Sequence, residues 1–412
     1  MDVLLFRALS LLGLAILVAL AARRLRLPYT VGLVLAGAAL ALTRSHAGLA
    51  LTHDLIFDIV LPPLLFEAAL NLRWSDLRRD LVPVVALSTI GVALCAVVVA
   101  GGLIGLLGWP PESALVFGAL ISATDPISVI ALLKETGVTG RLRLLIEAES
   151  LFNDGAAAVF FTLILIWAAH DPARAQDPLA VVTTFAIVAG GGLAAGFGVG
   201  LIAVMIAGTS DDHLVETALT VVAAFGSFLI AEHFGASGVL ASVAAGMTMG
   251  NLGVLMQKER FGLSITPHGR AFVLEFWEFA AFLANSLVFL LIGSAMATID
   301  FAREGFVALA LVIALALLGR AVAVYPVCLA FARSHWAIPR NQQHLMWWGG
   351  LRGALALALA LALPGDLPLR GDILISAFAV VAFSVIVQGL TAPLALKAAR
   401  VTPRKRAVGS GR

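Results

Sequence analysis

Charged residues are scarce in this chain of 412 residues. Asp, Glu, Lys and Arg make up 13% of it, whereas soluble globular proteins carry roughly 25%. The formal net charge is +2, which leaves no basic face of the kind that binds nucleic acid. Hydrophobic residues account for 61% of the sequence. A water-soluble domain and a nucleic-acid partner are therefore excluded, and the composition predicts a membrane protein that crosses the bilayer many times.

Several catalytic and structural motifs are also absent. The two cysteines, Cys95 and Cys328, lie in apolar runs and imply no disulfide framework. No G-x-x-x-x-G-K-[ST] motif occurs, which argues against an ATP-driven pump. The lack of H-E-x-x-H and G-x-S-x-G motifs argues against an intramembrane protease. We expect no enzymatic activity and no cofactor.

The hydrophobic runs are continuous in Leu, Ala, Val and Gly, which is typical of spanning helices of about 20 residues and not of alternating β-strands. Breaking the chain at polar clusters predicts thirteen such helices. Their ranges are 4–22, 28–43, 54–72, 81–107, 112–133, 142–169, 179–208, 212–233, 236–250, 271–297, 304–332, 341–363 and 372–397.

The distribution of lysine and arginine orients these helices. The odd-numbered connections and the C-terminal tail hold 20 of the 27 basic residues, and the opposite side holds 5. Positive charge collects on the cytoplasmic side, so we expect the N-terminus outside and the C-terminus in the cytoplasm. The remaining two, Arg320 and Arg352, fall inside predicted helices. Arginine outnumbers lysine, a bias that we associate with bacterial genomes of high GC content, and we expect a bacterial inner-membrane location.

Four of the carboxylates inside predicted helices are good candidates for a functional role: Glu67, Asp125, Glu149 and Asp154. An acid at the bilayer centre costs about 2.5–3.5 kcal/mol, so such residues are functional candidates by default. Counting 1.5 Å per residue places Glu67, Asp125 and Asp154 about 18–20 Å from one end of a hydrocarbon core about 30 Å thick. We therefore expect these three to converge near the midplane.

The segment 147–155 carries a polar stripe along one helix. A spacing of four residues places Ser150 above Asp154 and Glu149 above Asn153. The stripe thus offers a hydroxyl, an amide and two carboxyls. These hard oxygen donors suit an alkali cation.

Two of the predicted helices contain breaks. Pro126 disfavours helical geometry at Asp125 and cannot donate to the preceding turn. The glycines of 349–353 interrupt a second helix around Arg352. Interrupted helices in corresponding positions of two halves indicate an inverted-repeat secondary transporter.

The same pattern divides the chain. We expect a single transmembrane unit over 1–398, in which repeat one covers about 1–170, a connector helix about 179–208 and repeat two about 212–398. Residues 399–412 form a short basic tail, which the charge distribution places in the cytoplasm.

The buried charges suggest separate roles. We expect Arg320 to neutralise Glu149, while Asp125 and Arg352 offset opposite helix-end dipoles at the broken-helix crossing. Asp154 is then free to exchange a proton for a cation. A single exchanging acid that faces each side in turn gives one-for-one antiport, in which sodium and protons compete.

Other small and titratable residues have simpler expectations. Gly192, Gly196 and Gly200 share one helix face and predict close helix packing, and Gly246 and Gly250 predict the same. Among the eight histidines, the better candidates for a pH sensor are His233 and His344. The other six, including His53, fall at helix ends or in connections, where we expect them to be solvated.

Six stretches in order resemble the monovalent cation:proton antiporters of the NhaP type, relatives of the sodium/hydrogen exchangers. They are LPPLLFEAAL (61–70), SATDP (122–126), ESLFNDG (149–155), FLANSLVFLLIG (282–293), GRAVAVYP (319–326) and GGLRGALALAL (349–359). The resemblance implies an all-α membrane protein of the NhaA-like antiporter fold, with 13 transmembrane helices, two inverted six-helix repeats and two broken crossing helices. It also implies a homodimer in which a core domain moves against a static dimerisation domain.

The resemblance further implies the site. Asp154 would be the ion-binding aspartate, and Na⁺ would be held by Asp154, Ser150, Glu67 and Thr124, with Asn153 and Asp125 in the same site. Glu149 and Arg320 would form a structural salt bridge, and Asp125, Pro126 and Arg352 would form the crossing. The Asn153-Asp154 pair implies electroneutral exchange of Na⁺ or Li⁺ for H⁺ in pH homeostasis. A K⁺/H⁺ antiporter of the same fold stays open, because hard oxygen ligands alone do not separate sodium from potassium.

Overall fold

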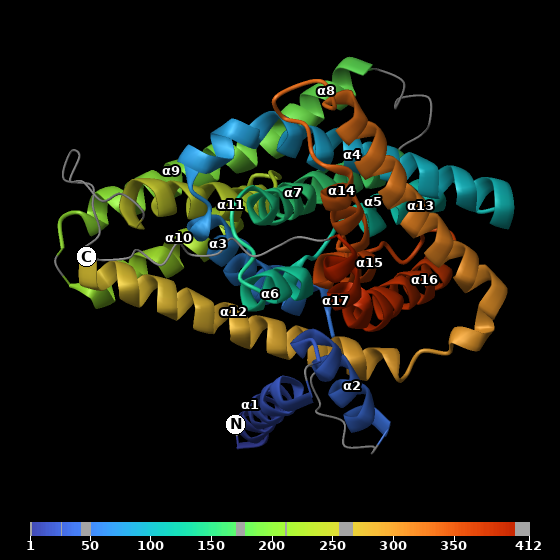
Figure 1. The fold of residues 1–412 in the computed structure, drawn as a ribbon, viewed down its shortest axis with the longest axis horizontal. Coiled ribbons are helices and arrows are strands. Elements are labelled where there is room, and N and C mark those ends of the chain that lie inside the picture. The colour runs from blue at the N-terminus through green and yellow to red at the C-terminus, as the bar shows by residue number, and fades with distance from the viewer. Residues whose placement is uncertain are drawn as a thin grey trace, which may run out of the picture.

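The computed structural model describes residues 2–25, 27–42, 51–169, 178–210, 212–254 and 267–399, and all regular elements within these ranges are helical (Figure 1). In chain order the α-helices are α1 (Asp2–Leu25), α2 (Tyr29–Leu42), α3 (Leu61–Asn71), α4 (Trp74–Leu107), α5 (Pro111–Ser122), α6 (Ile127–Glu135), α7 (Arg141–Ala169), α8 (Pro178–Phe185), α9 (Gly191–Ala207), α10 (His213–His233), α11 (Gly238–Thr248), α12 (Pro267–Met296), α13 (Phe306–Ala330), α14 (Arg340–Trp348), α15 (Ala354–Leu361), α16 (Arg370–Phe383) and α17 (Gly389–Ala398). Short π-helical or 3₁₀ turns precede or extend them: η1 (Leu55–Val60), η2 (Ala186–Gly190), η3 (Met249–Val254), η4 (Phe301–Arg303) and η5 (Ser384–Gln388).

Long apolar helices dominate the molecule. Within the described residues, 8 helical segments are long and apolar enough to cross a membrane, among them Trp74–Leu107, Arg141–Ala168 and Phe306–Ala330. Tyr29–Leu42 and Gly238–Val254 are among the shorter apolar helices. The prediction of a polytopic helical membrane protein is confirmed.

Helix α4 begins earlier than the sequence predicts, at Trp74 and not near residue 81. The polar residues that suggested a connection form a first helical section that bends at Asp80, whose φ is −117° and ψ is 16°. Arg141 holds this bend: its Nε donates to the Asp80 carboxylate at 2.9 Å, and its Nη1 donates to the Ala337 carbonyl at 2.8 Å. The ion pair between Arg141 and Asp80 therefore joins the polar first section of α4 to the start of α7.

Both predicted helix breaks are present. α5 ends at Ser122 and α6 starts at Ile127, because Ala123 has extended geometry (φ −56°, ψ 140°) and Pro126 follows. α14 ends at Trp348, and α15 starts after Gly353, whose φ is −137° and ψ is −147°. The two interruptions meet, since the Asp125 amide donates to the Leu351 carbonyl at 2.7 Å.

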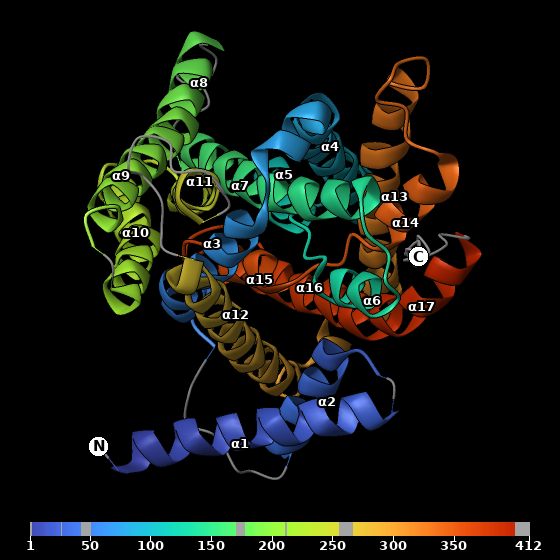
Figure 2. The ribbon, with the colours of Figure 1, turned by 60° about the vertical axis from the view of Figure 1, so that its left-hand side comes forward.

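The helices gather in groups around this crossing. α4 packs against α5, α7 and α13, and α15 packs against α5 and α16. In a second group α9, α10 and α11 pack together, with α3 beside α11. Figure 2 shows α12 running from this second group to the helix pair α1 and α2 at the lower edge, and α12 packs against both α2 and α3.

Glycines allow the closest of these contacts, as the sequence predicts. A Cβ at Gly192 or Gly196 would collide with a carbonyl oxygen of Ser237 or Ala241, at the start of α11. A Cβ at Gly246 would lie 2.8 Å from the Phe66 carbonyl oxygen of α3. The backbones of α9, α11 and α3 therefore touch directly, which side chains at these positions would prevent.

Candidate ion-binding site

The polar stripe of α7 faces the break between α5 and α6. The Ser150 hydroxyl donates to the Thr124 carbonyl at 2.5 Å, and the Thr124 amide donates to the Asp154 carboxylate. The Asn153 side-chain amide donates to Glu149 Oε1 at 3.2 Å. The helical spacing and the proline break thus bring Thr124 next to Ser150 and Asp154, as the sequence predicted.

Two oxygens in this cluster are buried without a hydrogen-bond partner among the described residues. They are the hydroxyl oxygen of Thr124 and the amide oxygen of Asn153. Buried polar atoms are nearly always satisfied. Neutral oxygens beside the Asp154 carboxylate match the hard donors that an alkali cation prefers.

Exposure separates the acids of the cluster. Glu149 is buried, as are Ser150 and Asn153, whereas Asp154 and Asp125 remain partly exposed. An exchangeable proton or ion needs a path to water. Of these two partly exposed carboxylates, Asp125 accepts a hydrogen bond at the helix break and Asp154 accepts one from the Thr124 amide.

Arg320 and Glu149 form the predicted ion pair. Arg320 Nη1 donates to Glu149 Oε1 at 2.7 Å and Nη2 donates to Oε2 at 2.9 Å, and the two side chains are only 5% and 3% exposed. Such bidentate geometry is among the strongest forms of this interaction. Arg320 Nη2 also donates to the Met346 carbonyl at 3.0 Å in the last turn of α14. The pair therefore neutralises Glu149 and ties α7 and α13 to the second broken helix.

Asp125 and Arg352 make hydrogen bonds to the helix ends at the crossing, where the sequence predicted them to offset the helix dipoles. Arg352 Nη1 donates to the carbonyls of Ser122 and Ala123 at 2.8 and 2.9 Å, where α5 ends. Asp125 Oδ1 accepts from the Ile127 amide at 3.1 Å, where α6 begins. A cation thus faces a helix C-terminus and an anion faces an N-terminus, which is the favourable arrangement for both dipoles.

Glu67 lies on α3, which packs against α7. It is four residues before the end of α3, and its carboxylate accepts from Asn71 Nδ2 at 2.9 Å. Its charged neighbours are Lys134, Arg143, Glu147 and Glu278. Within the described residues no hydrogen bond joins it to the α7 stripe. The expected convergence of Glu67 with Asp125 and Asp154 near the midplane therefore stays a prediction.

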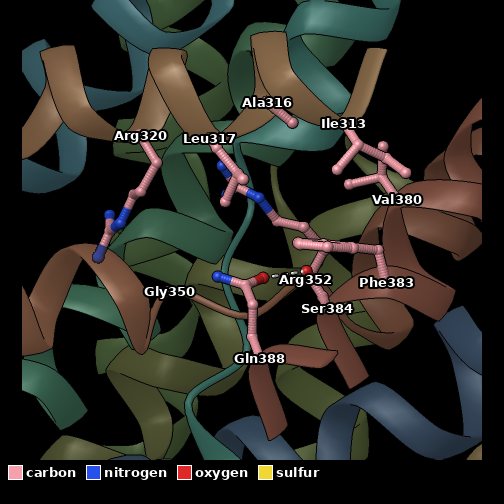
Figure 3. Close-up of a pocket in the computed structure, with 10 residues that line it drawn as sticks. All are labelled: Ile313, Ala316, Leu317, Arg320, Gly350, Arg352, Val380, Phe383, Ser384 and Gln388. Atoms are coloured by element: carbon pink, nitrogen blue, oxygen red, sulfur yellow. Dashed lines mark hydrogen bonds between the residues drawn. The ribbon is translucent and has the colours of Figure 1, made fainter. Parts of the chain in front are cut away.

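A cavity behind the crossing contains polar residues that the sequence analysis missed (Figure 3). The cavity is small, and Arg320 and Arg352 line it together with Ser384 and Gln388 of η5. Ser384 donates to Gln388 Oε1 at 2.7 Å, and Gln388 Nε2 donates to the Trp348 carbonyl at 2.9 Å. Polar residues one turn apart in the apolar run 372–397 were the available signal. They cap the end of α14 and so hold the broken helix in place.

Outside the spanning helices, one carboxyl is strongly perturbed. Burial, followed by the hydrogen bond and charge of Asp372, raises the pKa of Glu304 to about 7. This pair joins the α12–α13 connection to the first turn of α16. Its charged neighbours in the described chain are Asp372 and Arg303, so it is separate from the α7 stripe.

Helices interrupted at a common crossing, with buried carboxylates beside the break, define the class of this protein as a helical secondary transporter. Residues 11–398 match the family model described as sodium/hydrogen exchanger, transmembrane, and the chain belongs to this family. It is 40% identical to the Na⁺/H⁺ antiporter ApNhaP of Aphanothece halophytica, over 92% of this chain and 71% of that protein. It is 35% identical to the Na⁺/H⁺ antiporter NhaH of Halobacillus aidingensis, over 93% of this chain and 94% of that protein.

A solved structure shares the fold. The sodium proton antiporter MjNhaP1 from Methanocaldococcus jannaschii at pH 8 superposes with a TM-score of 0.74, covering 96% of this chain and 100% of that chain. The sequence identity is 23%. The helical architecture is therefore common to two chains whose sequences differ at most positions.

Proposed function

We propose that this protein exchanges Na⁺ or Li⁺ for H⁺ across the membrane, one for one, with Asp154 carrying either ion. The observation that carries the proposal is the partly exposed Asp154 carboxylate beside the unpartnered oxygens of Thr124 and Asn153 among the described residues. Relatives of the chain are named Na⁺/H⁺ antiporters, which favours sodium over the K⁺/H⁺ alternative.

We assign the cation to Asp154, Ser150 and Thr124, with Asn153 and Asp125 completing the site. Ser150 donates its proton to the Thr124 carbonyl, and its oxygen lone pairs stay available for a cation. Glu67 belongs to the solvent shell on the path to the site, because it lies near the end of α3. No cofactor is needed, since the chemistry is ion exchange at oxygen atoms.

Charge balance supports electroneutral exchange. Arg320 offsets Glu149, and Arg352 and Asp125 serve opposite helix ends at the crossing. Asp154 is left as one negative charge that a proton or a monovalent cation neutralises equally. If the empty charged form crosses the barrier poorly, exchange becomes obligatory and moves no net charge.

The architecture that fits this function has thirteen spanning helices in two inverted repeats. The broken helices α5–α6 and α14–α15 then occupy corresponding positions in repeat one (about 1–170) and repeat two (about 212–398). We place the N-terminus outside and the C-terminus in the cytoplasm of a bacterial inner membrane. Of the basic tail 399–412, residues 400–412 lie outside the described residues. We further propose a homodimer, embedded in membrane lipid, in which a core domain that contains the broken helices moves against a static dimerisation domain.

Proton flux in proteoliposomes tests the proposal. With an imposed pH gradient, we expect sodium and lithium to collapse the gradient in the wild type, and Asp154→Asn to abolish the response. A clamped membrane potential leaves the rate unchanged if exchange is electroneutral. Asp366→Asn is the matched control, because Asp366 is exposed in the connection after α15.

Three outcomes contradict parts of the proposal. Collapse by potassium alone favours the K⁺/H⁺ alternative. Unimpaired exchange in Asp154→Asn means that another carboxylate carries the ions. A rate that follows the clamped potential rules out one-for-one exchange.

A further inference from the structure

His53 makes a hydrogen bond between two distant parts of the chain. It lies two residues before η1, and its Nδ1 is 3.0 Å from the carbonyl oxygen of Ala358 in α15. A carbonyl can only accept, so Nδ1 carries a hydrogen in this contact. α15 is the half-helix that follows the crossing at Arg352 and Gly353. The bond therefore ties the beginning of the η1–α3 span to an element of the broken-helix crossing.

Aromatic packing fixes the orientation of the His53 ring. The ring stacks on Phe57, with centroids 4.8 Å apart and planes 24° apart. Phe57 in turn meets the edge of Phe228 in α10, with centroids 5.2 Å apart. The imidazole is thus held toward α15 and is not the freely solvated side chain that the sequence suggested.

Acidic side chains surround this contact. Glu232, at the end of α10, interacts electrostatically with both His53 and Asp58. The amide of Gly238 donates to Glu232 Oε1 at 2.7 Å and fixes the carboxylate. Asp54 adjoins His53 in the chain and is exposed. A positive charge on the imidazole would therefore meet negative charge from η1 and from α10.

The other elements that pack here add little charge. α11 and α15 contain no ionisable side chain. The ionisable residues of α12 all lie within 267–278, and Glu278 is beside Glu67 at the opposite end of the η1–α3 span. His233 is exposed next to Glu232 and contacts the ring of Phe234.

We propose that His53 is a proton-sensitive latch, a positioning residue that holds α15 against the η1–α3 span and must release it for the ion site to change sides. The latch rests on the proposed function, because it presumes that the crossing moves during exchange. Protonation strengthens it in two ways: the bond to Ala358 becomes charge-assisted, and the ring is attracted to Asp58 and Glu232. A low pH on the side of the membrane that His53 faces therefore slows the conformational change by which the ion site changes sides.

The latch and competition at Asp154 change different kinetic constants. Competition raises the apparent KM for sodium and is overcome at saturating sodium. The latch lowers Vmax, because it retards a conformational step that follows binding. Imidazole is the side chain whose charge ordinarily changes between pH 5 and 8, so the test is made across that range.

His53→Gln tests the latch, because glutamine can donate to the same carbonyl and does not titrate. We expect wild-type Vmax at saturating sodium to fall about three- to tenfold between pH 7.5 and 5.5 on the His53 side, as a charge-assisted bond forms. The variant has a flat Vmax while its KM for sodium still rises in acid. His233→Gln is the matched control and keeps the wild-type profile. A wild-type Vmax profile in His53→Gln overturns the proposal.

Two further measurements cover a poorly folded variant. Glu232→Gln removes one of the nearby acids, so it shifts the fall of Vmax to lower pH, and an unshifted profile counts against the latch.

A crosslinking test uses the double variant His53→Cys/Ala358→Cys. We expect a short cleavable thiol crosslinker to stop exchange in this variant, and reduction of the crosslinker to restore it. Both native cysteines are buried, and the single-cysteine variants treated with the same reagent are the controls. Exchange at the uncrosslinked rate in crosslinked protein overturns the latch. If wild-type protein shows no sodium-driven proton flux at all, the proposed function itself fails.

Discussion

Glu149 and Asp154 lie on one helix, and their surroundings differ. Glu149 meets a guanidinium in bidentate geometry and is fully enclosed. Asp154 receives a backbone hydrogen bond from Thr124 and stays partly exposed. The first carboxylate is held in a buried ion pair, and the second is the acid to which the proposed exchange is assigned.

The buried ion pair between Glu149 and Arg320 contributes to stability only as a pair. Glu149→Gln or Arg320→Met alone leaves a buried charge unpaired, and we expect each to lower the free energy of unfolding by about 3–5 kcal/mol. The double variant Glu149→Gln/Arg320→Met destabilises less than the two single changes together, since neither charge remains. Thermal unfolding of the purified protein in detergent measures all three.

A more exposed ion pair of equal length is the control. Arg143 and Glu147 are also 2.7 Å apart, with side chains 29% and 23% exposed. Because water screens such a pair, Arg143→Met changes stability by no more than about 1 kcal/mol. Additive losses in the double variant at Glu149 and Arg320 would mean that the two residues do not act as a pair.

Among the helices, glycines decide how closely two backbones approach. Gly196 and Gly198 are two residues apart in α9 and differ completely in surroundings. A Cβ at Gly196 would collide with the Ala241 carbonyl oxygen of α11, whereas a Cβ at Gly198 would meet nothing within 4 Å. The same substitution therefore has opposite consequences at the two positions.

We expect Gly196→Ala to destabilise the protein by about 1–3 kcal/mol, because α9 and α11 must separate. Gly198→Ala is neutral or stabilises by up to about 1 kcal/mol, since alanine loses less entropy in a helix. Unfolding temperatures of the two variants, measured side by side in detergent, check this. Equal destabilisation by both changes would contradict the close contact between α9 and α11.

For the molecule as a whole, the proposed exchange mechanism predicts a pH dependence. A proton and a sodium ion compete for the Asp154 oxygens, and each weakens the binding of the other by the same factor. Lowering the pH therefore raises the apparent KM for sodium, by up to about tenfold per pH unit in the acidic limit.

The His53→Gln background isolates this competition from the proposed latch. Sodium-driven proton flux is measured there over a range of pH, with the membrane potential clamped. We expect KM to rise in acid while Vmax stays constant. A KM that is independent of pH, with only Vmax changing, would be evidence against simple competition at Asp154.

Features that depend on neighbouring residues follow from the amino-acid sequence alone. Composition excluded a soluble protein, because so few charges cannot cover a water-exposed surface. Pro126 and the glycines of 349–353 located both helix breaks, since proline and glycine act on the backbone within one turn. The four-residue period placed Ser150 and Asp154 on one face, and the pairing of Glu149 with Arg320 agreed with the count of buried charges and with the family resemblance.

Contacts between distant residues became known only when the helices were placed in space. Glu67 lies near the end of α3, and Lys134 and Arg143 are among its charged neighbours. The ends of a helix predicted from hydropathy do not fix how deep each of its residues lies in the membrane. His53 and Ala358 are 305 residues apart, and their hydrogen bond depends on how the η1–α3 span packs against α15. Helical periodicity and backbone rules act locally, whereas these contacts arise from the packing of whole helices.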